Sequence, residues 1–168
     1  MKELAALSDK TLTVFRNDFL KVQGSIDTNL YVVESGSLRI FVLDGCEERT
    51  IRFGYAGDVL VALDSFLTGN PSGLLIQALK KTVVKVVRKK QWDTFLEAAE
   101  NRSVWSRMLE NLVVQQLERE VDILTASPKE RYERVLARSP RLFQEIPGRH
   151  IANYLRMSPE TLSRLKKS

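Results

Sequence analysis

Residues 158–167, Ser-Pro-Glu-Thr-Leu-Ser-Arg-Leu-Lys-Lys, are the stretch from which the organisation of this chain is best inferred. Ser158 can cap free backbone amides, and Pro159 suits the first helical position because no donor is needed there. Glu160 then favours the positive end of the helix dipole. The stretch therefore predicts a short helix with a strong N-terminal cap.

The two faces of this predicted helix differ in character. Leu162 and Leu165 lie three residues apart and can pack against a preceding helix. The outer face has the chemistry of base and phosphate contact, since Arg pairs with guanine, Glu accepts from cytosine, and Ser or Thr reaches either. The segment alone leaves a DNA-contacting helix and a capped basic helix of a soluble domain equally open. The outer residues are Glu160, Thr161, Ser163, Arg164 and Lys167.

The basic excess of the chain is confined to its last quarter. The net charge is +5; residues 127–168 contain ten Lys and Arg against four Asp and Glu, while residues 1–126 contain 16 against 17. A localised positive field suits a polyanion. A membrane surface is a weaker candidate than nucleic acid, because the basic residues are spread over short segments and form no long amphipathic face.

Length and composition set the broad class. A chain of 168 residues with 43% hydrophobic content suits one domain and a small appendage. No apolar run approaches the roughly 20 residues that cross a bilayer, and the Met-Lys-Glu-Leu-Ala-Ala start lacks a signal-peptide core, so we expect a cytoplasmic protein. The single cysteine, Cys46, excludes an internal disulfide and an all-cysteine metal site, and we interpret it as an incidental thiol.

Residues 13–88 have the texture of a strand-rich domain. Short β-branched and aromatic runs are separated by Gly, Asn and Asp, at the regular spacing of a sandwich or barrel. Because no long crossover helix interrupts them, we predict a β jelly roll of two facing antiparallel sheets, within an α+β protein. The first dozen residues are interpreted as a remnant of helix. The predicted strands are 30–33, 38–42, 50–53, 74–79 and 83–87, with turns at 34–36, 44–45, 54–58 and 68–73.

Helical periodicity begins near residue 90, with a short helix over 91–99 and a long one over 103–125. An apolar stripe runs along the long helix for about six turns. It could pack on the β domain, but we favour a second identical helix as its partner, in a parallel dimer. The stripe also contains Val121 and Leu124, and the residues assigned to the dimer seam are Trp105, Leu109, Leu112, Val113, Gln116 and Leu117.

The last 42 residues resemble a small helical domain. Ser127-Pro128-Lys129-Glu130 is a capping box that begins a helix, with Tyr132, Val135 and Leu136 facing inward. A second helix is predicted over 148–155, and residues 156–158 form a tight turn before the last helix, as in a helix-turn-helix unit. No wing is evident. The predicted domains are a β-roll over 1–100, a dimerisation helix over 101–126 and a DNA-binding domain over 127–168.

Several segments together carry a family resemblance. Ile151-Ala152-Asn153-Tyr154-Leu155 with Ser158-Pro159-Glu160-Thr161-Leu162-Ser163-Arg164, after a strand-rich domain and a long helix, resembles the CRP/FNR transcription regulators. The segments at 64–69 and 127–132 are similar to short members common in Bacteroidetes-type bacteria. The resemblance implies base contacts by Glu160, Ser163 and Arg164, and phosphate or base-edge contact by Thr161; Pro159 stands where some members place a DNA-contacting Arg. The predicted phosphate contacts are Arg141, Arg149, Arg156, Lys166 and Lys167.

The resemblance also implies a cyclic-nucleotide-binding fold for the β domain. The family's phosphate cassette needs a Gly-Glu pair and an Arg, but residues 57–78 contain no Arg or Lys, and 71–73 occupy the neighbourhood of the Arg. We therefore expect no cyclic AMP binding and no cofactor; another effector, or none, is left open. One Cys and one His do not suit the oxygen-sensing or haem branches. The candidate effector-pocket residues are Gly57, Asp58, Asp64, Ser65, Phe66, Ser72 and Gly73.

Two other classes of protein fit the sequence less well. A cupin enzyme needs clustered metal ligands, whereas the only histidine, His150, is interpreted as a partly exposed helix residue or phosphate neighbour, so no enzyme and no metal is expected. A dimeric effector-binding or protein-interaction module would present an aromatic or aliphatic anchor on the exposed face of the last helix, where Glu160, Ser163 and Arg164 offer none. The sequence therefore predicts a transcriptional regulator that binds a near-palindromic duplex as a homodimer, with RNA polymerase as a candidate further partner.

Overall fold

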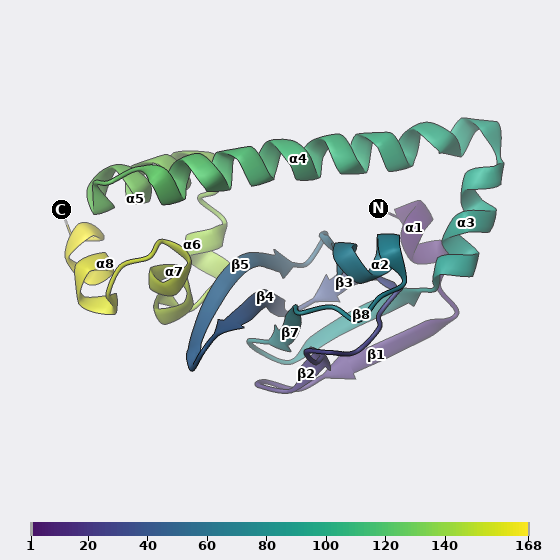
Figure 1. Ribbon diagram of the computed structural model, residues 1–168, viewed down its shortest axis with the longest axis horizontal. Coiled ribbons are helices and arrows are strands. Elements are labelled where there is room, and N and C mark those ends of the chain that lie inside the picture. The colour runs from purple at the N-terminus through teal and green to yellow at the C-terminus, as the bar shows by residue number, and fades with distance from the viewer. Residues whose placement is uncertain (1, 168) are drawn as a thin grey trace. The chain divides into compact units, whose positions relative to one another are not determined.

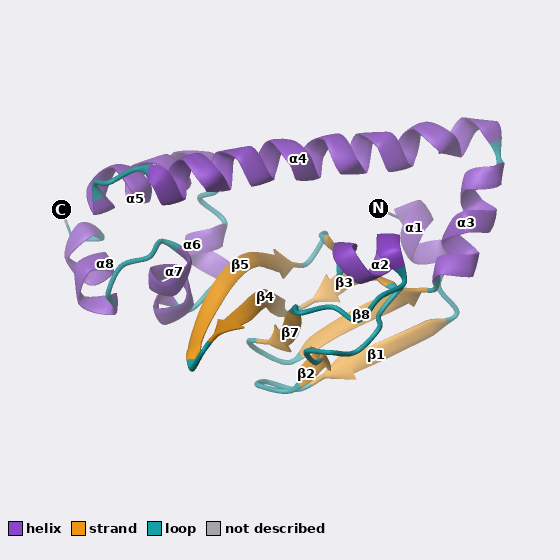
Figure 2. Ribbon diagram, in the orientation of Figure 1, coloured by secondary structure: helices purple, strands orange, loops and turns teal. Residues whose placement is uncertain are grey.

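The computed structural model describes residues 2–167, and the chain divides into two compact units, 1–99 and 100–168. All the strands belong to the first unit, whereas the second is built from helices (Figure 2). The mixed helix and sheet content is as predicted. The finer division of the second unit into a dimerisation helix and a DNA-binding domain stays a prediction.

The first unit contains two four-stranded antiparallel sheets (Figure 1). The strand order is β1-β8-β3-β6 in one sheet and β2-β7-β4-β5 in the other. Each strand is hydrogen-bonded to its neighbours in antiparallel register, which confirms the predicted sheet type. The strands are β1 Lys10–Val14, β2 Phe19–Lys21, β3 Leu30–Ser35, β4 Ser37–Asp44, β5 Glu47–Tyr55, β6 Val59–Val61, β7 Leu75–Ala78 and β8 Thr82–Val87.

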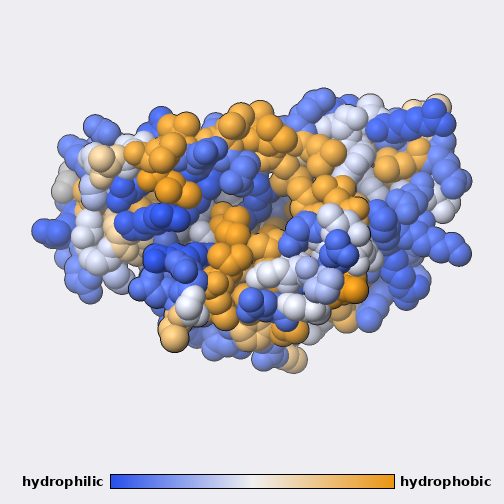
Figure 3. All heavy atoms as spheres, viewed as in Figure 1, coloured by the Kyte–Doolittle hydropathy of each residue, from blue (hydrophilic) through white to orange (hydrophobic). Residues whose placement is uncertain are grey.

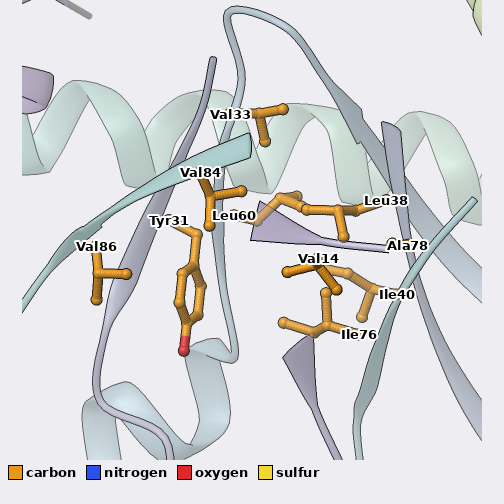
Figure 4. Close-up of a cluster of buried hydrophobic side chains, with 10 residues drawn as sticks. All are labelled: Val14, Tyr31, Val33, Leu38, Ile40, Leu60, Ile76, Ala78, Val84 and Val86. Carbon is orange, nitrogen blue, oxygen red and sulfur yellow. The ribbon is translucent and has the colours of Figure 1, made fainter. Parts of the chain in front are cut away.

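The core of this unit lies between the two sheets (Figure 4). Tyr31 and Val84 from one sheet meet Leu38, Ile40 and Ile76 from the other, and all five are at most 4% exposed. Alternate residues of a strand point to opposite faces, and β3, β4, β7 and β8 each contribute two residues, two positions apart, to this layer. The facing sheets predicted from the sequence are thereby confirmed.

Two glycines predicted to lie in turns have different positions in the structure: one is in a turn and the other is inside a strand. Gly36 ends β3 at a tight turn with φ 91°, where a Cβ atom would lie 2.3 Å from Thr82 Oγ1. Gly54, predicted to begin a turn, instead lies inside β5, and a Cβ atom there would lie 2.7 Å from the Leu60 side chain. The close approach of β6 therefore requires glycine within the strand.

The helices of the first unit lie at its ends and beside the sheets. Helix α1 spans Lys2–Ala6, α2 spans Leu63–Thr68 and α3 spans Lys89–Glu97. In α3, Trp92 is 1% exposed and stacks on Phe95 at a centroid distance of 5.6 Å. Helix α2 was not predicted, and α3 begins two residues before the predicted start.

The second unit contains α4 Arg102–Leu124, α5 Pro128–Arg138, α6 Leu142–Glu145, α7 Gly148–Tyr154 and α8 Pro159–Leu165, after a short 3-10 turn at Ala99–Asn101. Both predicted serine caps are present, although at Ser127 only the serine half of the predicted capping box is found. Ser127 Oγ accepts a hydrogen bond from the Glu130 amide at 3.3 Å, and Ser158 Oγ accepts one from the Thr161 amide at 3.2 Å. Each cap satisfies an amide that has no partner within its helix.

Two further findings concern the described part of the chain. Over residues 2–167, no helix combines the length and the apolar character that crossing a membrane requires. The same residues include no group of three or more His, Cys, Asp or Glu side chains placed to hold a metal ion.

Candidate nucleic-acid interface

Helix α8 is held in place by its inner face. Leu162 is 2% exposed, and α8 contacts both α7 and α5. Ile151 of α7, Leu155 just after it and Val135 of α5 are buried as well. Leu165 is half-buried. Burial of each such side chain contributes about 1.5–3 kcal/mol. The predicted inward face is therefore the observed one.

The turn between α7 and α8 is tight and strained. Arg156 has φ 52°, a left-handed conformation that residues other than Gly rarely adopt. Its amide donates to Asn153 O at 3.1 Å, and the Met157 amide donates to Ala152 O at 3.0 Å. A left-handed residue with a Cβ atom costs roughly 1–2 kcal/mol. The turn thus retains an exposed arginine at a position that glycine would fill more easily.

The outer face of α8 presents the residues predicted to read bases. Glu160, Ser163, Arg164 and Lys167 are exposed, and Thr161 is half-buried beside the cap, its hydroxyl 3.2 Å from Ser158 Oγ. Hydrogen bonds from the backbone amide of Glu160 and from the Ser158 hydroxyl lower the pKa of the Glu160 carboxyl. It is therefore an ionised acceptor near neutral pH, next to the donors of Arg164. This combination suits the edges of cytosine and guanine.

The five side chains predicted to contact phosphate differ in their exposure and in their contacts within the chain. Arg156 and Lys167 are exposed. Arg141 lies 3.6 Å from the Glu145 carboxylate, and Lys166 Nζ lies 5.7 Å from the centre of the Phe143 ring. The Arg149 side chain donates to its neighbour in α7. Three of the five therefore already contact groups within the chain.

His150 corrects one prediction. The sequence suggested a partly exposed side chain, but His150 is 8% exposed and its Nε2 accepts from Arg149 Nε at 3.1 Å. It lies on the inward face of α7 with Ile151 and Ala152, which are also buried. In so short a helix, three consecutive buried residues cannot be recognised from a 3.6-residue period.

Helix α4 has apolar residues on its exposed face and charged residues on its buried face. Val113, Leu117 and Leu124 are 58%, 57% and 76% exposed, whereas Arg119 and Asp122 are 6% and 0% exposed. In Figure 3, hydrophobic surface covers the left and middle of the upper edge of the view, where α4 lies in Figure 1. A contiguous exposed apolar stripe marks an interaction surface. Of the other predicted seam residues, Gln116 is exposed, and the half-buried ones are Trp105, Leu109 and Leu112.

The buried charges of α4 join it to the helices that follow. Asp122 accepts from Arg134 Nε at 3.1 Å and pairs closely with Arg138, whose Nε also lies 3.1 Å from Glu118. These contacts raise the pKa of Arg138. Arg119 lies over the Tyr154 ring of α7 at 3.8 Å. This network was not predicted from the sequence, since the partners are 12 to 35 residues apart.

The candidate effector region of the first unit contains a cation that was not predicted from the sequence. Lys21 of β2 is 4% exposed, and its Nζ donates to Leu74 O at 2.8 Å, Val22 O at 3.0 Å and Ser72 O at 3.4 Å. Burial lowers the pKa of Lys21, against the raising effect of Asp27 and Asp64. Residues 57–78 contain no basic side chain, but β2 supplies Lys21, whose ammonium group is already hydrogen-bonded to three carbonyl groups.

The remaining effector-pocket predictions fall in two places. Ser72 is 1% exposed and its Oγ accepts from the Leu74 amide at 3.0 Å; Gly73 beside it is exposed. Asp58 Oδ2 accepts from the Tyr55 amide at 2.9 Å, in the turn between β5 and β6. That turn also contains Gly57, and α2 contains Asp64, Ser65 and Phe66.

A buried polar cluster links α2 to the segment before β3. Ser65 Oγ accepts from the Asp27 amide at 2.8 Å, and the Asp27 carboxylate accepts from the Tyr31 hydroxyl at 2.8 Å and from Asn29 Nδ2 at 2.9 Å. Burial, with Asp27 nearby, raises the pKa of Tyr31 far above its ordinary value, so its hydroxyl stays a donor. The chain therefore satisfies these polar groups internally.

The family of the chain follows from its first unit. Residues 12–99, more than half of the 168, match the cyclic nucleotide-binding domain family. The chain belongs to this family. A search of curated proteins found no match to the chain.

Solved structures extend the likeness of this cyclic nucleotide-binding domain protein beyond residue 99. FixK2 from Bradyrhizobium japonicum is 20% identical with a TM-score of 0.79, over 94% of this chain and 82% of that one. A CooA mutant from Carboxydothermus hydrogenoformans is 15% identical with a TM-score of 0.76, over 98% and 77%. A CRP-family transcriptional regulator from Thermus thermophilus is 18% identical with a TM-score of 0.69, over 93% and 82%. The fold is thus that of CRP/FNR-type regulators, as predicted.

Proposed function

We propose that this protein is a sequence-specific DNA-binding transcriptional regulator of the CRP/FNR type. The observation that carries the proposal is the outer face of α8, where Glu160, Ser163 and Arg164 are exposed on a helix fixed by buried Leu162. Such a helix, entered through a tight turn, fits the major groove and offers a donor and an acceptor to base edges. The basic excess of residues 127–168 supplies the attraction to phosphate.

The proposed binding form is a homodimer formed through α4. Two copies of the exposed stripe of Val113, Leu117, Val121 and Leu124 would cover each other, while the buried charges of α4 stay within each protomer. A two-fold arrangement places two α8 helices in successive major grooves, about 34 Å apart. A near-palindromic operator is the expected ligand.

Cyclic AMP is not the proposed signal. Lys21 could balance a phosphate only by leaving three carbonyl groups, and Ser72 occupies the loop where the family places an arginine. Uncovering buried carbonyl groups costs about 1–3 kcal/mol for each group left without a donor. The proposed regulator therefore binds DNA without this nucleotide.

Selection from a random duplex library tests this proposal. The purified protein should enrich an inverted repeat whose half-site centres lie about 10 base pairs apart. A parallel selection with Arg164→Ala should retain the symmetry of the repeat but lose information at one base pair of each half-site. An absence of any enriched sequence, with retention of all duplexes at low salt, would contradict the proposal.

A further inference from the structure

Arg131 in α5 makes an unusual set of hydrogen bonds, all to backbone carbonyl groups. It is 9% exposed, and its Nε donates to Leu155 O at 2.9 Å. Its Nη1 donates to Thr125 O at 2.6 Å and Ala126 O at 3.0 Å, and its Nη2 donates to Arg156 O at 3.2 Å. Four of the five N–H groups of one guanidinium are thus used.

These acceptors lie just past the ends of two different helices. Helix α4 ends at Leu124 and α7 ends at Tyr154, and neither has a basic residue in its last turn. The carbonyl groups at a helix C-terminus lack intrahelical donors and carry the negative end of the helix dipole. The Arg131 guanidinium therefore caps both helix ends at once.

The Arg131 side chain joins two backbone segments that matter for the proposed DNA binding. Thr125 and Ala126 lead out of α4, the proposed dimer helix, while Leu155 and Arg156 lead into the turn before α8. A planar guanidinium holds its donors in a fixed fork, so the separation of the two backbone segments is fixed too. A lysine ammonium at this position would be a flexible point charge.

We propose that Arg131 is a positioning residue that sets how far apart the two α8 helices lie in the dimer, and hence which half-site spacing the protein accepts. The inference rests on the proposed function for the DNA and the dimer. It goes beyond that function because Arg131 is not among the residues assigned to DNA contact. Its action is through the backbone of the turn that begins at Leu155.

A matched control exists on the same helix. Arg134 lies three residues from Arg131, is more exposed, and donates to the buried side chain of Asp122. This hydrogen bond joins α5 to α4 and does not reach the turn before α8. Arg134→Lys therefore changes the same residue type on the same helix without loosening the start of α8.

The first experiment measures binding to a set of duplexes. The selected inverted repeat is titrated with spacers shortened or lengthened by one and two base pairs, together with a single half-site, using wild type, Arg131→Lys and Arg134→Lys. We expect Arg131→Lys to bind the preferred spacing about tenfold more weakly, as the loss of one or two charge-assisted hydrogen bonds implies. Its affinities for the other spacings should change by less than about twofold, and the half-site should be bound as before.

The second experiment requires no DNA. Hydrogen exchange is measured at the Arg156 and Met157 amides, which donate to Asn153 O and Ala152 O in the turn. Exchange there should become faster in Arg131→Lys and stay unchanged in Arg134→Lys. A structural role alone would lower the melting temperature and weaken all duplexes, including the half-site, in the same proportion.

Three outcomes overturn the proposal. A spacing preference of Arg131→Lys identical to that of wild type removes the positioning role, and so does a uniform loss across all duplexes. A wild-type protein without any preferred duplex overturns the proposed function and the spacing role together. In that case the exchange rates still decide whether Arg131 holds the two helix ends, because they are measured on the free protein.

Discussion

The loop over residues 70–74 in the β unit and the outer face of α8 in the helical unit differ in how their polar groups are satisfied. Lys21 donates to two carbonyl groups of the loop, those of Ser72 and Leu74, and Ser72 also accepts from the Leu74 amide. On α8, Glu160 and Arg164 are exposed. A ligand at the loop must displace these internal hydrogen bonds, whereas the polar face of α8 is open to solvent. The difference favours α8 as the place where this protein meets its partner.

The largest effect is expected at the proposed dimer stripe, on which the function of α8 depends. Leu117→Glu should weaken dimerisation by about 3–5 kcal/mol, because it leaves an uncompensated charge in an apolar interface. Binding to the inverted repeat should fall to the level of a single half-site. Sedimentation velocity over a range of concentrations, followed by titration of the duplex, measures both changes.

The control for this variant is Asn111→Glu. Asn111 is exposed on the same helix, and its six-residue separation from Leu117 places it about 120° around the helix axis. It adds the same charge away from the stripe, so dimerisation should be unchanged. An equal loss in both variants would indicate a general effect of charge on α4 and would remove the dimer assignment.

The next largest effect concerns the exposed face of α8 directly. Arg164→Ala should remove about 1–3 kcal/mol of discrimination at one base pair, because a bidentate contact to guanine is lost. Lys167→Ala, also exposed, should instead weaken all sequences alike and reduce the salt slope by about one. Competition titrations with single-base variants of the repeat separate the two; an unchanged preference in Arg164→Ala would contradict the base-reading role.

A change in the β unit should affect stability and leave DNA preference alone. Lys21→Met should destabilise the fold by about 1–3 kcal/mol, because buried carbonyl groups lose their donor. Urea denaturation at pH 7 measures this difference. A change in sequence preference without a change in stability would show that the loop and α8 are not independent.

The stability difference between wild type and Lys21→Met should depend on pH. Burial lowers the pKa of Lys21 in the folded protein below its ordinary 10.5, so the unfolded chain binds more protons in the window just below that value. The wild type should therefore gain stability relative to Lys21→Met as pH rises through this window. A difference in the free energy of unfolding that is constant from pH 8 to 10 would contradict the buried charge.

The smallest effect is expected at the turn before α8. Arg156→Gly should stabilise the protein by about 1 kcal/mol, since it relieves the left-handed strain at φ 52°. The same change should weaken DNA binding and reduce the salt slope by about one, because a phosphate contact is lost. Thermal unfolding and titrations at several salt concentrations test the two halves of this prediction. Loss of both stability and binding would assign Arg156 to the fold alone.

The sequence predicted elements that depend on local chemistry. The starts of α5 and α8 follow from Ser127 and Ser158, whose hydroxyl groups bond amides three residues away. The short strands β2 and β6 were not predicted, since three residues carry no clear alternation and their pairing partners are distant in the chain. Strand β1 was missed as well: the first dozen residues were interpreted as a remnant of helix, but α1 ends at Ala6 and β1 begins at Lys10.

The missed side-chain roles share one physical cause. Lys21 meets Ser72 and Leu74 more than 50 residues away, and Arg131 meets carbonyl groups of the turn 24 and 25 residues away. A backbone carbonyl group has no signature in the sequence, so neither acceptor set could be inferred from residue types. The exposed residues of α8, by contrast, were predicted because helix period alone separates them from Leu162.

Fluorescence-anisotropy titration of the selected inverted repeat and a scrambled duplex, at two salt concentrations with and without cyclic AMP, tests the central claim most directly. We predict a preference for the repeat of roughly 10³-fold, within the usual range for specific DNA binding, and no change on adding the nucleotide. Equal affinity for both duplexes, governed by salt alone, would contradict sequence-specific binding by α8. Preference that appears only with cyclic AMP would contradict an internally satisfied β unit.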